Sequence, residues 1–204
     1  MADQSAIQAW DERFAAPDYI FGTSPNVFLE QQAHRFRHGH KVLSLADGEG
    51  RNGVFLAEQG CDVLATDVSP NALKKAEALA RARGVTIKTE VADLATWRWP
   101  DAAFDAVAAI FIQFSDPPER ERIFAGIKRT LKPGGLLLLH GYRPEQLRYD
   151  TGGPPSAERC YTRAYLEREF SGFASIEIAE YDRVLAEGTW HNGNSALIDL
   201  VGVK

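Results

Sequence analysis

The sequence predicts a mostly parallel, doubly wound α/β sheet of seven strands that ends in an antiparallel hairpin. Between residues 42 and 139, short apolar segments alternate with helical patterns, which is typical of successive strand–helix–strand units. The last part of the chain differs, because two strand-like segments follow one another with no helix between them. A chain of 204 residues has the length of one such domain.

Five apolar segments are expected to form the parallel strands: residues 42–45, 63–66, 85–91, 104–112 and 136–139. The helices between them carry boundary signals. Ser69 and Asp116 each precede a proline, as N-cap residues do, and Gly84 ends the first of these two helices. Another helical pattern runs from residue 54 to Gly60.

The C-terminal third predicts a different arrangement. Residues 149–159 are rich in Gly, Pro and Ser and indicate a loop, and a short helix is expected over 163–170. Strands are expected over 176–181 and 196–203, with residues 191–194 in the connection. These two strands must pair antiparallel, because a parallel return needs a crossover of about a dozen residues.

Composition and charge indicate which kinds of binding partner and which cellular compartment to expect. The formal net charge is −5, which gives no electrostatic reason to expect nucleic acid or an anionic membrane. We expect a cytoplasmic protein for three reasons. The chain has only two cysteines, no apolar segment approaches the roughly 20 residues of a membrane span, and there is no signal-peptide pattern. His34 and His38 have helical spacing but no carboxylate or cysteine nearby, so no metal site is expected.

The most informative segment is the glycine-rich turn after the first strand, where Gly48 to Gly53 fits G-x-G-x-x-G. This pattern alone also fits an NAD(P)-dependent reductase. However, Asp47 and Glu49 place negative charge where a pyrophosphate would bind, so the turn favours a cationic or zwitterionic ligand. Asp67 ends the next strand, 19 residues after Gly48, and is placed to accept hydrogen bonds from a ribose. Asp93-Leu94 ends the third strand and is placed to contact an adenine.

With these motifs the chain resembles the class I S-adenosylmethionine-dependent methyltransferases, which have a Rossmann-like fold. The resemblance extends over nearly the whole chain, and it also includes residues 104–107, 111–114 and 131–135. Ser44 and Ala46 stand where the family pattern has Asp and Gly, so Asp47, Glu49 and Arg51 are expected to supply the charge. Residues 10–14, 21–26, 48–52, 149–154 and 187–193 are most similar to small bacterial methyltransferases of the tellurite-resistance and thiopurine type.

The resemblance implies roles for particular residues. Residues 1–40 are expected to form a helical cap or lid over a core of residues 41–204, the two making one domain. S-adenosylmethionine is expected to contact Phe21, Gly22, Ala46, Asp47, Gly48, Gly50, Asn52, Asp67, Val68, Asp93, Leu94, Phe111 and Gln113. The substrate is expected to contact Trp10, Phe14, Arg143 and Tyr149. His140, His191 and Tyr142 are the candidate catalytic residues.

The function expected from the sequence is therefore in-line methyl transfer from S-adenosylmethionine to a small molecule such as a thiol or a chalcogen oxyanion. An NAD(P)-dependent reductase and a non-catalytic S-adenosylmethionine-binding relative are the alternatives. The sequence does not indicate the acceptor, the need for a general base or the oligomeric state.

Overall fold

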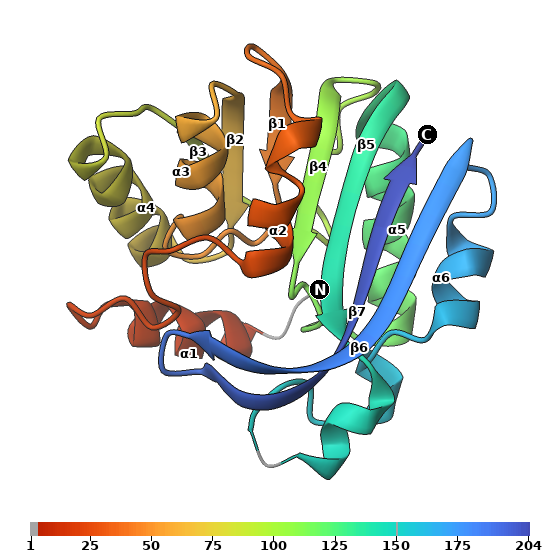
Figure 1. Ribbon diagram of the computed structural model, residues 1–204. Coiled ribbons are helices and arrows are strands. Elements are labelled where there is room, and N and C mark those ends of the chain that lie inside the picture. Colours follow the sequence, from red (N-terminus) through yellow and green to blue (C-terminus); the bar gives the residue numbers. More distant parts are fainter. Residues whose placement is uncertain (1–3, 150) are drawn as a thin grey trace.

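A computed structural model describes residues 4–149 and 151–204; Met1–Asp3 and Asp150, part of the predicted loop, lie outside the described residues. Seven strands form one sheet in the order β3-β2-β1-β4-β5-β7-β6 (Figure 1). In the part of the chain described, β7 pairs antiparallel with both β5 and β6, and the remaining pairs are parallel. The predicted fold class is thus confirmed. The strands are β1 (Lys41–Ser44), β2 (Asp62–Asp67), β3 (Lys88–Val91), β4 (Phe104–Ile110), β5 (Leu131–Tyr142), β6 (Ser175–Glu187) and β7 (His191–Val203).

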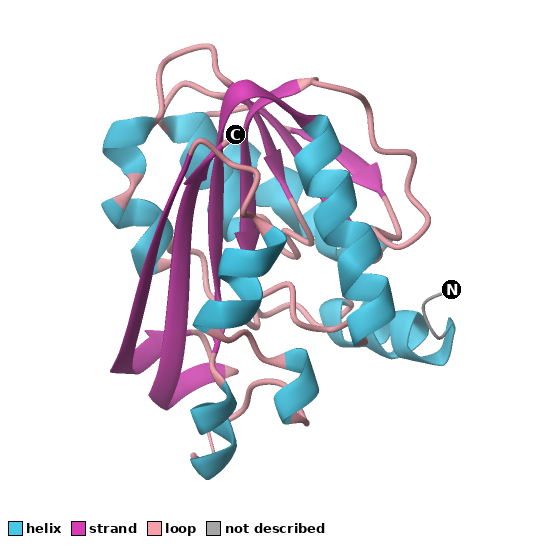
Figure 2. Cartoon of the chain, turned by 90° about the vertical axis from the view of Figure 1, so that its right-hand side faces the viewer, coloured by secondary structure: helices cyan, strands magenta, loops and turns pink. Residues whose placement is uncertain are grey.

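Helices cover both faces of the sheet (Figures 1 and 2). They are α1 (Gln4–Phe14), α2 (Val27–Gln31), α3 (Arg51–Glu58), α4 (Pro70–Ala82), α5 (Pro117–Thr130) and α6 (Arg163–Glu169). One apolar cluster joins the sheet to α2, α3 and α4, and the other joins it to α5 and α6. Strand β4 is buried on both faces, as its continuous apolar sequence predicts.

The predicted helix starts are confirmed. The Ser69 hydroxyl accepts a hydrogen bond from the Ala72 N–H at 3.0 Å, and the Asp116 carboxylate accepts one from the Glu119 N–H at 2.9 Å. Each cap pairs a backbone N–H that has no partner within the first turn of its helix. These caps fix where α4 and α5 begin relative to the carboxyl ends of the preceding strands.

Several predicted strand boundaries were wrong. Strand β5 starts at Leu131, because residues 132–135 form an irregularity in the strand, where the pairing moves from Phe104–Leu131 to Ala106–Leu136. Strand β3 begins only at Lys88, and β4 stops at Ile110. The hairpin strands are 13 residues each, and residues 191–194 are paired in β7, so the connection is only 188–190.

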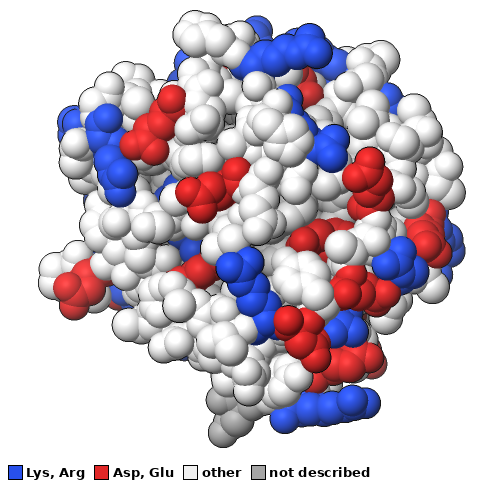
Figure 3. Space-filling view, in the orientation of Figure 1, with Lys and Arg blue, Asp and Glu red and all other residues white. Residues whose placement is uncertain are grey.

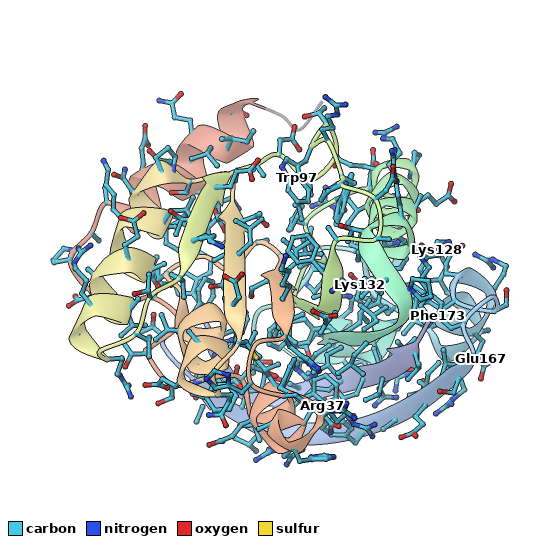
Figure 4. All side chains as sticks on the ribbon, turned by 90° about the horizontal axis from the view of Figure 1, so that it is seen from above. Arg37, Trp97, Lys128, Lys132, Glu167 and Phe173 are labelled. Atoms are coloured by element: carbon cyan, nitrogen blue, oxygen red, sulfur yellow. The ribbon has the colours of Figure 1, made fainter. Side chains whose placement is uncertain are left out.

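The carboxyl ends of the parallel strands meet at one edge of the sheet, called here the carboxyl edge. Helix α1 lies at this edge, and the long β6–β7 hairpin curves beneath it towards α1 (Figure 1). Figure 4 looks onto the opposite end of the sheet, with Arg37 and Lys132 labelled. In the described ranges, no helix has the length and apolar character needed to cross a bilayer.

Candidate functional site

The turn between β1 and α3, residues 46–50, forms the centre of the carboxyl edge. Ala46, Gly48 and Gly50 adopt the left-handed conformation, with φ of 45°, 58° and 90°. A Cβ atom on Gly50 would lie 2.5 Å from the Cβ of Ala76, so bare backbone is required for the turn to pack on α4. At Gly48, the nearest atom to such a Cβ is Cζ of the Phe14 ring, at 3.7 Å. The backbone of Gly48 therefore faces an aromatic side chain.

Asp67, the last residue of β2, lies beside this turn, and Asp93 follows the end of the neighbouring strand β3 by two residues. The Asp67 carboxylate accepts hydrogen bonds from the N–H groups of Gly48 and Ser69, both at 2.9 Å. Burial raises the pKa of Asp67, although the hydrogen bonds oppose this. A carboxylate has about four acceptor positions, so Asp67 can accept further hydrogen bonds from a ligand. Asp93 accepts from the Ala95 N–H at 3.0 Å, and Leu94 beside it is buried.

Asp47 is directed towards α3. Its carboxyl group accepts hydrogen bonds from the Ser44 hydroxyl at 2.6 Å and from the Gly53 N–H at 3.0 Å. Burial raises the pKa of this carboxyl group to about 7 against the opposing effect of these hydrogen bonds. The Asp47 side chain thus caps the first turn of α3, while its own N–H donates to the Thr66 carbonyl at 2.9 Å.

Two buried ion pairs flank the turn. Glu49 pairs with Lys75, and Arg51 Nη1 lies 2.7 Å from Glu187 Oε2 at the end of β6. Glu187 also accepts hydrogen bonds from the Asn26 amide at 3.0 and 3.1 Å. Burial opposes ionisation of Glu187, but the Arg51 guanidinium and the Asn26 amide lower its pKa overall. Both cations beside the turn are therefore already paired with carboxylates.

The N-terminal segment is fastened to α4. The Asp11 carboxylate accepts hydrogen bonds from the Ser69 hydroxyl at 2.5 Å and from the Asn71 N–H at 3.0 Å, and these contacts lower its pKa. The Lys75 ammonium donates to the carbonyl groups of Ala16 and Asp18 at 2.8 and 2.6 Å. Helix α1 and the segment after it are thereby held over the turn.

An aromatic cluster joins α1, the hairpin tip and the end of β4. Its members are Trp10, Phe14, Phe21, Phe111, Trp190 and His191. The rings of Trp10 and Trp190 lie 5.7 Å apart, and those of Phe111 and His191 lie 4.1 Å apart. The tip is also bound through its backbone, because the Thr189 N–H donates to the Ile20 carbonyl at 2.9 Å. Residues far apart in the sequence thus cover the same turn.

The three candidate catalytic residues meet around the Phe111 ring, which lies 4.5 Å from His140, 4.8 Å from Tyr142 and 4.1 Å from His191. Phe111 itself adopts a left-handed φ of 57°. Burial, helped by the Arg51 charge, lowers the pKa of His191 to about 3, so this imidazole is neutral at pH 7. Burial raises the pKa of Tyr142, whose hydroxyl therefore keeps its proton.

Other predicted site residues make contacts within the protein. The Gln113 amide donates to the Tyr142 carbonyl at 2.9 Å and accepts from its N–H at 2.5 Å, which braces the end of β5. Arg143 and Tyr149 both contact Asp182, at 2.5 and 3.2 Å, on the exterior of the hairpin. Within the described part of the chain, neither Arg143 nor Tyr149 makes a ring contact with the aromatic cluster.

The remaining predicted cofactor residues lie close to the turn. Asn52 accepts a hydrogen bond from the Asn26 N–H at 2.9 Å, and a Cβ on Gly22 would lie 3.6 Å from the Gly188 nitrogen. Val68 separates Asp67 from the N-cap of α4. No group of three or more His, Cys, Asp or Glu side chains in residues 4–149 and 151–204 is placed to hold a metal ion.

Sequence reasoning missed Glu187 and Asp199 as residues of this edge. Asp199 of β7 contacts His140 of β5 through a side-chain hydrogen bond of 2.5 Å. Both acids meet partners more than 50 residues away. Glu187 belongs to the 187–193 segment of the family resemblance, but that resemblance gave it no role, and no motif marks Asp199. Only the pairing register of the last two strands brings them to the edge.

Comparisons with known proteins support the same fold and family. Residues 42–135 match a family model described as a methyltransferase domain. A demethylmenaquinone methyltransferase from Thermus thermophilus is 34% identical over 130 residues, covering 63% of this chain and 55% of that protein. This chain therefore spans little more than half the length of that relative. An uncharacterized methyltransferase from Synechocystis is 35% identical over 103 residues, which are 50% of this chain and 46% of that protein.

Solved structures share the architecture at low sequence identity. A S-adenosylmethionine-dependent methyltransferase from Methanosarcina mazei has a TM-score of 0.68 at 18% identity, covering 89% of this chain and 98% of that one. TehB from Haemophilus influenzae has a TM-score of 0.69 at 17% identity, covering 90% of this chain and 63% of that one. These similarities show a common fold.

Proposed function

Since the chain carries a class I S-adenosylmethionine-dependent methyltransferase domain, we propose that it transfers a methyl group from S-adenosylmethionine to a small-molecule acceptor. The observation that carries this proposal is the grouping of a bare glycine turn with the Asp67 carboxylate, which accepts from the Gly48 N–H at 2.9 Å. Asp93 lies two residues beyond the end of the neighbouring strand β3.

The charges around the turn fit this cofactor. Asp67 is a buried carboxylate, and the two nearby cations, Lys75 and Arg51, are paired with Glu49 and Glu187. A pyrophosphate would need unpaired donors or cations, as in dinucleotide sites. A ligand that has a sulfonium and an ammonium group and no phosphate is a better electrostatic match for the carboxylates around the turn than a pyrophosphate is. These charges therefore favour S-adenosylmethionine over NAD(P).

The chain's own residues have three tasks in the proposed reaction. Asp67 and Asp93 would hold the ribose and the adenine, and the backbone of the turn would lie against the remainder of the cofactor. When bound, S-adenosylmethionine supplies a methyl group on a positively charged sulfur. The aromatic cluster would exclude water and orient the acceptor, which accounts for much of the rate enhancement in a displacement of this kind.

We also propose that residues 1–40 act as the cap of this site. Phe14 faces Gly48, and Asp11 and Lys75 tie this segment to α4. An acceptor would then enter between α1 and the hairpin tip, where Trp10 meets Trp190.

Calorimetric titration tests the cofactor. The protein is expected to bind S-adenosylhomocysteine and not NAD, and Asp67→Asn should weaken binding about 10- to 100-fold, the value of hydrogen bonds to a charged group. Asp62→Asn is the matched control, because Asp62 lies at the other, exposed end of β2. Binding of NAD without S-adenosylhomocysteine would contradict the proposal.

Transfer of labelled methyl groups to a panel of thiols, amines and chalcogen oxyanions tests the reaction itself. Tight binding of S-adenosylhomocysteine without transfer to any of them would instead favour a non-catalytic binding protein.

A further inference from the structure

The sheet register fixes the orientation of the His140 imidazole. His140 of β5 lies directly opposite Asp199 of β7, and the distance from Nδ1 to the Asp199 carboxylate is 2.5 Å. Because a carboxylate only accepts hydrogen bonds, Nδ1 carries the proton. In the neutral ring, the free lone pair is then on Nε2.

Nε2 of His140 is buried and has no hydrogen-bond partner among the described residues. A buried polar atom without a partner costs about 1–3 kcal/mol unless a ligand or water pairs with it. The ring is held between Phe28, which stacks on it at 5.6 Å, and the edge of Phe111 at 4.5 Å. Nδ1 of His191, on the other side of Phe111, is likewise buried and without a partner in the described structure.

These atoms lie where an acceptor would react, at the carboxyl ends of β4 and β5 and next to the strand that carries the glycine turn. A molecule with an N–H, O–H or S–H group at this place would supply the donor that Nε2 lacks. The nearby Phe111 N–H is not available for this, because it already donates to the His140 carbonyl at 2.8 Å.

We propose that His140 and Asp199 form a proton-accepting pair, and that the acceptor is a small molecule that binds with a proton on its nucleophilic nitrogen, oxygen or sulfur. This inference rests on the proposed function and narrows its substrate class to amines, alcohols or phenols, and thiols. His140 is the catalytic residue of the pair, and Asp199 is a positioning residue.

The proposed step balances as follows. The lone pair of the acceptor atom forms the bond to the methyl carbon, and the carbon–sulfur bond breaks with its electrons remaining on sulfur. The proton of the acceptor moves to Nε2 of His140. The positive charge, initially on sulfur, ends on the imidazolium, where the Asp199 carboxylate stabilises it.

The alternative base, His191, is less suited to this step. Its pKa of about 3 makes it a weak proton acceptor at pH 7, and among the described residues no carboxylate hydrogen-bonds to its buried Nδ1. Tyr142 keeps its proton and can only donate or orient. His140 alone of the three combines a free lone pair with a carboxylate partner.

Asp199 also connects this pair to solvent. It lines a groove of about 600 Å³ on the α2 side of β6 and β7, together with Phe28, Gln32, Arg35 and Tyr181. In the view of Figure 3, acidic and basic side chains are interspersed over this face. After Nε2 of His140 gains a proton, the imidazolium can therefore lose its Nδ1 proton to solvent through Asp199, which reaches the groove.

Nitrogen-15 NMR of the histidine rings tests the pair without any acceptor. The wild type is expected to show His140 protonated on Nδ1 and unprotonated on Nε2, assigned by comparison with His140→Gln. Asp199→Asn should move the proton partly or wholly to Nε2. A wild-type ring protonated on Nε2 would overturn the proposal.

Kinetics test the acceptor class. His140→Gln should lower kcat/KM about 10²- to 10⁴-fold for an amine, a phenol or a thiol that binds with its proton, and leave transfer to selenite or thiocyanate within a few fold. Asp199→Asn should follow the same pattern, and the exposed His34→Gln is the control. Equal losses on both classes, or no loss on either, would overturn the proposal.

Two further measurements separate the possible failures. Thermal melting shows whether the variants are folded, and titration with S-adenosylhomocysteine should give the same affinity for His140→Gln and the wild type. Failure of the wild type to bind this ligand would refute the proposed function. Normal binding with the wrong tautomer or the wrong acceptor dependence would refute only the His140–Asp199 pair.

Discussion

The buried carboxyl group of Asp47 makes a specific prediction about stability and pH. Burial raises its pKa from 3.8 to about 7 in the folded chain. Between these two pH values the folded state holds a proton that the unfolded state has lost, so this group makes the protein less stable as pH rises. The difference of about 3 pKa units corresponds to about 4 kcal/mol once the pH exceeds both values.

Asp47→Asn should remove this pH dependence. The amide keeps the shape of the side chain, its oxygen can accept from the Gly53 N–H, and its nitrogen can donate to the Ser44 hydroxyl. We expect the variant to gain stability over the wild type as pH rises, by about 2–3 kcal/mol between pH 5 and pH 8.

Urea unfolding followed by circular dichroism at pH 5, 6, 7 and 8 measures this difference. Asp62→Asn serves as the control, because Asp62 is exposed at the start of β2 and its difference from the wild type should not change with pH. A difference between Asp47→Asn and the wild type that stays constant, or that shrinks as pH rises, would refute the argument.

Two further substitutions test other parts of the carboxyl edge. Glu187→Gln leaves the buried Arg51 guanidinium without a counter-charge, so it should cost about 3–5 kcal/mol in urea unfolding. Glu177→Gln, which removes an exposed acid, should cost less than about 1 kcal/mol, and similar costs would contradict the reasoning. Gly50→Ala should lower the free energy of unfolding by about 2–5 kcal/mol, because Gly50 has a left-handed φ and the added methyl group would be too close to α4. Gly84 also has a left-handed φ, but no atom lies near the added methyl group, so Gly84→Ala should lower the free energy of unfolding by only about 1–2 kcal/mol. Equal losses for the two variants would exclude the contact with α4 as the cause.

The parts of the fold that depend on local sequence were predictable. The N-caps Ser69 and Asp116 and the buried run of β4 each involve neighbours within a few residues or a simple apolar pattern. The glycine turn with Asp67 was predictable for the same reason, since the carboxyl ends of adjacent parallel strands must meet.

The antiparallel pairing of the last two strands was predicted, but their length and register were not. The outer half of the hairpin, from residue 182 to 194, is polar and mostly exposed, so it has no alternating apolar pattern. Because the hairpin is longer than predicted, Glu187 reaches Arg51. Because of the pairing register between β5 and β7, Asp199 faces His140. The hydrogen bond by which the Asp47 carboxyl group caps α3 was also not predicted.

The last hairpin has a consequence for how this protein is made on the ribosome. The central strands can pair while the chain is still emerging, since β1 to β5 end by Tyr142. The counter-charge for Arg51 is Glu187 and the partner of His140 is Asp199, and both are synthesised after all five of these strands. The parallel part of the sheet can thus pair before the proposed site is complete, and a product truncated at residue 186 would lack both acids.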